Sequence, residues 1–195
     1  MDRFKKLAPF IVAKISKEVA SSYYYHNLAH TLDVVQCVKS IGEKEKVTPL
    51  ELELLSVAAL LHDIGFINGP VDHEMRGSNY AQVILPAYSF KVDEIQIIAN
   101  LILSTKYPPQ PKCLLEKIIC DADLDYLGRT DFETISANLF KELKNANANL
   151  SVEEWNRIQV NFLTNHQYFT TTSLTLRSKT KMEHLTKLRL LIGEE

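Results

Sequence analysis

Glycine and cysteine are scarce in this chain, and each scarcity excludes a class of structure. Only six glycines occur in 195 residues, which leaves too few for the tight turns of an all-β protein. The three cysteines, Cys37, Cys113 and Cys120, are an odd number without CxxC spacing. We therefore expect no disulfide framework and a reducing compartment. Because all three lie in apolar, helix-like segments, we expect buried free thiols.

The chain also lacks an excess of positive charge and a long apolar run. Its formal net charge is −2, whereas a protein that binds a nucleic-acid backbone needs a concentrated basic face. We therefore expect no nucleic-acid partner, although a few local cations would suffice for a small phosphorylated ligand. The N-terminal segment is interrupted by Pro9 and Lys14, and it is too short and too charged for a signal peptide or a membrane span. We expect a cytoplasmic protein without a membrane partner.

What the sequence does contain is helical periodicity. Hydrophobic residues make up 46% of the chain, and they recur with helical spacing rather than strand alternation. Two capping boxes mark helix starts: Thr48 with Glu51, whose helix should end near Gly65, and Ser151 with Glu154. We predict an all-α fold, a single irregular helical bundle over residues 1–195. Further helices are expected over residues 3–20, 28–43, 73–85, 91–104, 112–127, 131–146 and 177–192.

Histidines and aspartates interrupt these apolar segments at separate places. His62 and Asp63 follow a run, residues 57–61, that is apolar nearly all round and is therefore buried. Buried polar groups must be paired, and coordination of a metal would satisfy both side chains at once. An alternative accounts for the pair equally well: His62 is a structural histidine hydrogen-bonded to a neighbour, and Asp63 is a cap. Mixed imidazole and carboxylate donors suit catalytic transition metals.

Two further clusters can contribute to the same centre. His26 and His30 are four residues apart and share one helix face if the helix begins early enough. Then His30 can be a ligand while His26 donates protons, although His26 can equally be exposed at a helix start. Asp121 and Asp123 follow another apolar stretch and point to nearly opposite helix faces. Only one of them can face a site, and a solvated acidic helix face is the alternative.

These motifs together resemble the H…HD…D signature of the HD-domain metal-dependent phosphohydrolases. The segment YHNLAHT (residues 25–31) resembles the entry to the first motif, and LLHDIGF (60–66) resembles the HD motif with its trailing glycine. DADL (121–124) resembles the last element, in which the aspartate after alanine is the usual ligand. The segment 168–185 resembles the closing helix of small HD phosphohydrolases. Similar spacing occurs in (p)ppGpp hydrolases, nucleotidases and, more distantly, cyclic-nucleotide phosphodiesterases, and the similarity covers roughly residues 23–188.

The resemblance implies an HD-type helical bundle with one divalent metal ion, which would be Mn, Fe, Co, Ni, Mg or Zn. The implied ligands are His30, His62, Asp63 and Asp123. Asp63 would also be catalytic, and His26 would protonate the leaving oxygen.

The resemblance has gaps at the positions of a second metal. Some relatives carry additional histidines between the HD pair and the last aspartate. In that interval this chain has one histidine, His73, which can support a second metal or contact the substrate phosphate. Tyr107 lies in a loop where some relatives carry another histidine.

A phosphohydrolase also needs cationic groups that hold the phosphate. The candidates are Arg76, Lys106, Arg129 and Lys179, although simple exposure to solvent accounts for each of them too. The two remaining histidines, His166 and His184, stand among polar neighbours and are expected at the surface or an interface.

The expected activity is hydrolysis of a nucleotide or another small phosphoester by a metal-activated water. The expected partner is that small phosphorylated substrate, and a homodimer is left open. The alternatives are a non-catalytic HD-type sensor that binds a metal or nucleotide, and di-iron oxygenase chemistry, which needs more ligands than the sequence shows.

Overall fold

The computed structural model describes residues 2–194, and within that range it contains α-helices and short 3-10 helices but no strand. The elements, in chain order, are α1 (Asp2–Glu18), α2 (Leu28–Lys44), α3 (Pro49–Leu61), η1 (Ile64–Asn68), α4 (His73–Ile84), η2 (Leu85–Tyr88), α5 (Val92–Ser104), α6 (Leu114–Asp123), η3 (Asp125–Gly128), α7 (Phe132–Ala146), α8 (Val152–Asn165) and α9 (Thr171–Leu191). The predicted all-α class is therefore confirmed. The predicted single domain also included residues 1 and 195, which lie outside the described residues.

Local hydrogen bonds determine where several helices begin. The side chain of Asn27 accepts hydrogen bonds from the first backbone N–H groups of α2. Thr48 and Glu51 form the predicted reciprocal capping box at α3, and Ser151 and Glu154 form the second one at α8. These caps satisfy backbone donors that have no partner inside the helix.

Two helices are shorter than the sequence suggested. The helix predicted over 112–127 ends at Asp123, because Leu124 leaves the helical conformation with φ −108° and ψ 18°. The 3-10 turn η3 follows and buries Tyr126 and Leu127 in a second core. Likewise, α3 ends at Leu61 and is followed by the turn η1, instead of continuing to Gly65. Both breaks place polar side chains at helix ends.

The last helix is longer than predicted, because it begins at Thr171 rather than at residue 177. The hydroxyl of Thr170 accepts a hydrogen bond from the backbone N–H of Ser173 and so caps this helix. The carboxylate of Asp121 accepts hydrogen bonds from the backbone N–H groups of Phe169 and Thr170. These tertiary contacts outweigh the modest helix propensity of the threonine-rich start.

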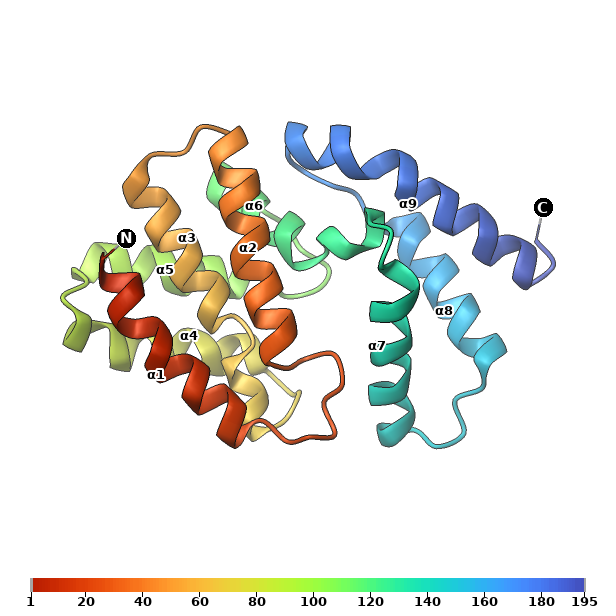
Figure 1. The fold of residues 1–195 in the computed structure, drawn as a ribbon, viewed down its shortest axis with the longest axis horizontal. Coiled ribbons are helices and arrows are strands. Elements are labelled where there is room, and N and C mark those ends of the chain that lie inside the picture. Colours follow the sequence, from red (N-terminus) through yellow and green to blue (C-terminus); the bar gives the residue numbers. More distant parts are fainter. Residues whose placement is uncertain (1, 195) are drawn as a thin grey trace.

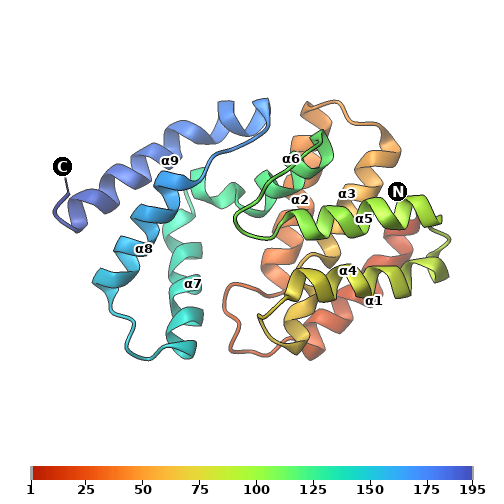
Figure 2. The same ribbon diagram turned by 180° about the vertical axis from the view of Figure 1, so that it is seen from behind.

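Two hydrophobic clusters hold the bundle together, and Figures 1 and 2 show α1–α6 grouped on one side of the molecule and α7–α9 on the other. The larger cluster joins α1 to α6, and α2 packs against both α3 and α6 within it. The smaller cluster joins η3, α7, α8 and α9 through residues such as Tyr126, Leu163 and Leu188. Tyr25, which precedes α2, also packs in the smaller cluster and so connects the two parts of the bundle.

The surroundings of three side chains differ from expectation. Cys113 is exposed, because it lies just before α6 rather than inside a helix, whereas Cys37 and Cys120 are buried free thiols as predicted. His166 and His184 were expected at the surface or an interface but are buried inside the bundle, only 6% and 7% exposed. His184 donates a hydrogen bond to the carbonyl of Arg129, and its ring stacks on Phe132, which explains its burial.

Among the described helices, none combines the length and the hydropathy needed to cross a bilayer.

Candidate metal centre and substrate pocket

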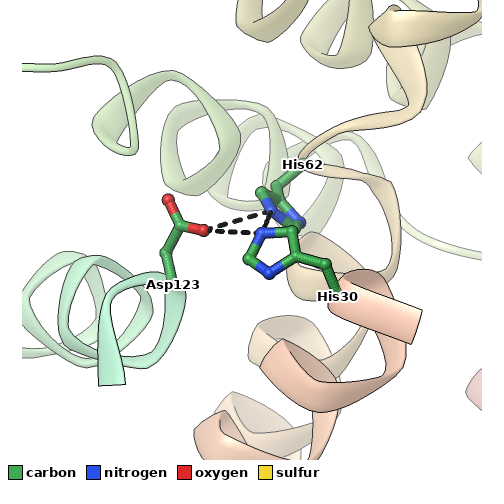
Figure 3. Close-up of side chains that lie close together, drawn as sticks. All are labelled: His30, His62 and Asp123. Carbon is green, nitrogen blue, oxygen red and sulfur yellow. Dashed lines mark hydrogen bonds and ion pairs between the residues drawn. The ribbon is translucent and has the colours of Figure 1, made fainter. Parts of the chain in front are cut away.

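Three helices bring one side chain each to a common point (Figure 3). His30 lies in the first turn of α2, His62 follows the last residue of α3, and Asp123 is the last residue of α6. The Nε2 atoms of the two imidazoles are 3.3 Å apart. The Oδ1 atom of Asp123 lies 3.1 Å from Nε2 of His30 and 3.4 Å from Nε2 of His62. Three of the four predicted ligands therefore form one compact group.

The orientation of His62 suits coordination of a cation. Its Nδ1–H donates a hydrogen bond of 2.8 Å to the backbone carbonyl of Ala59. In the neutral ring, Nε2 then carries a lone pair, and this nitrogen faces the group. A hydrogen bond from the far ring nitrogen to a carbonyl is the usual way in which a metal-binding histidine is oriented.

The fourth predicted ligand, Asp63, lies beside the same two imidazoles. Its Oδ2 atom is 3.2 Å from Nε2 of His62 and 3.5 Å from Nε2 of His30. This oxygen is buried and accepts no hydrogen bond from the protein, which is costly for a carboxylate. A cation at the centre would satisfy it. The donor set of two imidazoles and two carboxylates therefore fits a divalent transition metal.

The pKa values of the group show that each carboxylate is stabilised by nearby positive charge. Burial alone would raise the pKa values of Asp63 and Asp123, but the neighbouring imidazoles outweigh burial and lower both. Burial alone would lower the pKa of His62, but the charges of Asp63 and Asp123 raise it well above its ordinary value. Both carboxylates therefore stay ionised, and a proton or a metal cation must balance them.

The carboxylates of Asp63 and Asp123 stand at helix ends where a negative charge does not stabilise the helix. Asp123 ends α6, and Asp63 follows the C-terminal end of α3. The carbonyl end of a helix carries partial negative charge, so that an anion there is disfavoured. Two aspartates at two such ends point to a functional requirement.

His26 lies beside the centre and is held by a residue that the sequence analysis missed. Its ring stacks on Phe66, with 4.1 Å between the ring centroids, and its Nδ1 makes a short hydrogen bond to the carboxylate of Glu142 on α7. The same carboxylate accepts hydrogen bonds from the backbone N–H groups of Tyr25 and His26, at 2.8 and 3.0 Å. Burial lowers the pKa of His26, but the bond to Glu142 and the nearby carboxylates outweigh it and raise the value. The sequence offered only one signal for Glu142, its place on the apolar face of a helix.

The structure also settles which aspartate of the DADL segment faces the group. Asp121 accepts hydrogen bonds from the backbone of Phe169 and Thr170 and from the hydroxyl of Thr170, at 2.9, 2.8 and 2.6 Å. Its carboxylate therefore stabilises the start of α9, while Asp123 faces the two histidines.

His73 is brought to the site, whereas Arg76 is not. His73 begins α4, its Nδ1–H donates to the carbonyl of Pro70, and its Nε2 lies 3.4 Å from Oδ1 of Asp63. The guanidinium of Arg76 donates instead to the carbonyls of Gly65 and Gly69, and so it fixes the turn η1.

The other expected phosphate-binding cations lie elsewhere. Lys106 is exposed, 3.6 Å from a carboxylate oxygen of Asp72, and Lys179 is exposed beside Glu183. Arg129 pairs at 2.9 and 2.8 Å with Asp33 and Asp131. None of these three residues, nor Arg76, lines the cavity described next. The arrangement gives no support to their expected roles in substrate binding. Carbonyl or acidic groups hold the two arginines, and the two lysines are exposed side chains that do not line the cavity.

A cavity of about 380 Å³ opens beside the centre and extends between the two parts of the bundle. Its polar end is formed by side chains that include His26, Asp63, His73 and Asp123, and Tyr107 also lines it. Its other walls come from η3, α7 and α8 and are mostly apolar. This volume is typical of a site for one small molecule.

Comparisons with known proteins identify the family of the chain. The chain belongs to the HD-domain family, because the HD domain family model matches residues 27–125, just over half of the chain. The matched range contains His30, His62, Asp63 and Asp123. A solved structure, the crystal structure of a predicted HD superfamily hydrolase from an uncultured Thermotogales bacterium, is similar to the chain with a TM-score of 0.64 and 21% identity. The match covers 95% of this chain and 91% of that one, which shows a shared fold. No curated protein matches the chain.

Proposed function

We propose that this protein is a metal-dependent phosphohydrolase that cleaves a small phosphoester. The observation that carries the proposal is the convergence of His30, His62 and Asp123 beside a buried oxygen of Asp63 that accepts no hydrogen bond. Membership of the HD-domain family supports it.

In this proposal, His30, His62, Asp63 and Asp123 hold one divalent ion. Such an ion lowers the pKa of a coordinated water towards neutrality and polarises a phosphoryl oxygen. The ligand types do not select among Mn, Fe, Co, Ni, Mg and Zn.

The chain's own residues would then move the protons. His26 lines the cavity, and Glu142 occupies its Nδ1, which leaves Nε2 as the nitrogen free to meet a substrate. Its raised pKa favours the protonated ring, so that His26 would donate a proton to the leaving oxygen. Asp63, which lines the cavity beside the centre, would orient the attacking water.

The test is a metal analysis of the purified protein, followed by a screen of small phosphoesters with each of several divalent ions. We expect about one equivalent of bound metal and phosphate release that depends on it. The variant Asp63→Ala should lose both. A protein that binds metal but releases no phosphate from any ester would contradict the proposal and favour a sensor instead.

A further inference from the structure

The cavity beside the metal centre has an apolar chamber that the catalytic residues do not explain. One face of α7 contributes Leu139 and Leu143, and one face of α8 contributes Trp155, Ile158 and Phe162. The two leucines of α7 are four residues apart, and the three residues of α8 follow one another at spacings of three and four. Each set therefore lies on one side of its helix. All of them lie outside the range 27–125 that the family model matches.

The chamber leaves apolar surface uncovered. Leu143 and Ile158 line it and are nevertheless 37% and 46% exposed. The polar side chains that α7 and α8 add to the wall are Ser136 and Gln159, which hydrogen-bond to each other. The amide of Gln159 also donates to Asn156, at 3.3 Å. The wall therefore offers a ligand apolar contact and few free hydrogen-bonding groups.

The scarcity of positive charge in the cavity limits how many phosphate groups the ligand can carry. Within residues 2–194, no lysine or arginine lines the cavity. A di- or triphosphate carries several charges, and proteins usually hold such groups with arginine, lysine or multiple backbone donors. A single phosphoryl group needs only the metal centre and the adjacent His26.

We infer that the ligand of this cavity is a phosphate monoester of an apolar alcohol, with an alkyl or aryl body in the chamber between α7 and α8. The phosphoryl group lies at the centre formed by His30, His62 and Asp123. This inference rests on the proposed function. In the reaction, the oxygen of water forms a new bond to phosphorus, the ester P–O bond breaks, and the leaving oxygen takes a proton to give the free alcohol and inorganic phosphate.

The kinetic test uses n-alkyl phosphates from methyl to octyl. Their alcohols differ little in acidity, so that the chemical step stays nearly constant along the series. Each methylene that enters the chamber should raise kcat/KM roughly threefold to fourfold until the chamber is full. Adenosine monophosphate, which has a polar body, should be a poorer substrate than hexyl phosphate.

The binding test does not require turnover. Trp155 is the one tryptophan of the chain and lines the chamber, so that its fluorescence reports occupancy. Alkyl phosphonates, whose C–P bond is not hydrolysed, should quench or shift this emission, with a Kd that falls as the alkyl chain lengthens.

Two variants localise the effect. Ile158→Gln should flatten the dependence on chain length, because it places an amide in the chamber wall. Leu174→Gln is the matched control: Leu174 is 48% exposed on α9 and does not line the cavity, so that the dependence should be unchanged.

The outcomes separate the two proposals. Phosphate release that is independent of chain length would overturn the inference and leave the proposed function standing. Phosphonate binding that strengthens with chain length, without any hydrolysis of the esters, would support the inferred ligand and contradict the proposed function. No effect of any alkyl phosphonate on Trp155 would overturn the inference.

Discussion

Asp121 and Asp123 are two residues apart, yet they have different partners and should respond differently to the same substitution. Asp123 faces two imidazoles, whereas Asp121 accepts three hydrogen bonds at the start of α9. Asp123→Asn removes a charged ligand and should weaken metal binding by roughly 100-fold or more, since even partners outside the ligand set are worth 10- to 100-fold. Metal titration by calorimetry measures this.

Asp121→Asn is the control for that prediction. Its amide cannot accept all three hydrogen bonds, so that the free energy of unfolding should fall by about 1–3 kcal/mol while metal binding is retained. Loss of metal in the Asp121 variant together with retention in the Asp123 variant would reverse our assignment.

His26 should matter for turnover and not for metal binding. His26→Ala should slow hydrolysis by roughly 10²- to 10⁴-fold if this residue is the general acid, because the leaving oxygen would depart without a proton. The loss should shrink for esters with good leaving groups, such as p-nitrophenyl phosphate. An equal loss for good and poor leaving groups would assign His26 to binding, and unchanged kinetics would make it structural.

His166 should make folding stability depend on pH. Burial, with the nearby charge of Lys181, lowers its pKa to about 3. Above pH 6.5, about the unfolded pKa, both states are neutral at this position and its effect on stability is absent. As the pH falls from there towards 3, only the unfolded chain binds the proton, and stability is lost by up to about 1.4 kcal/mol per pH unit.

The comparison is urea unfolding of the wild type and of His166→Gln at pH 7, 6 and 5. The wild type should lose more stability than the variant over this range. Parallel losses in the two proteins would show that His166 is protonated in the folded state as well.

At the scale of elements, the approach of η1 to α4 is tight enough to need glycine. A Cβ atom at Gly65 would lie 2.1 Å from the backbone oxygen of His73, so that one backbone segment would have to move. Gly65→Ala should cost about 1–3 kcal/mol or more of unfolding free energy, and it should weaken metal binding because Asp63 directly precedes η1. Thermal unfolding and metal titration of the variant measure the two effects. An unchanged Tm would contradict the prediction and show that the turn accommodates a Cβ atom without loss of stability.

Much of the helical layout could be predicted from the sequence, because its signals are local. The capping boxes at Thr48 and Ser151 and the apolar periodicity placed α3 and α8 correctly at their starts. The early end of α6 and the early start of α9 could not be predicted, since contacts between distant segments, such as Asp121 with Thr170, decide them.

The candidate centre was partly predictable for a related reason. The histidines His30 and His62 stand beside apolar runs, a pattern that is visible locally, whereas the choice of Asp123 over Asp121 came from the resemblance to the HD signature. Glu142 was missed because its contact with His26 joins positions 116 residues apart. The role expected for Arg129 was likewise not supported, because its ion pair with Asp33 joins positions 96 residues apart and could not be predicted from the sequence.

For the molecule as a whole, each hydrophobic cluster supports a different side of the candidate site. The cluster of α1–α6 sets the ends of α2, α3 and α6 together and so builds the centre. Helices α7 and α8, which pack in the second cluster, supply Glu142 and the apolar wall. The cavity lies where the two parts meet. In our proposal, the reaction and the recognition of the ligand therefore depend on different parts of one bundle.

The most direct test of this account is a crystal structure with anomalous diffraction data from protein loaded with manganese or zinc. We predict one strong anomalous peak within about 2.0–2.3 Å of Nε2 of His30, Nε2 of His62 and a carboxylate oxygen of Asp123. A well-ordered structure of protein shown to contain the metal, but with the peak elsewhere or with these three side chains bonded only to one another, would contradict the central claim.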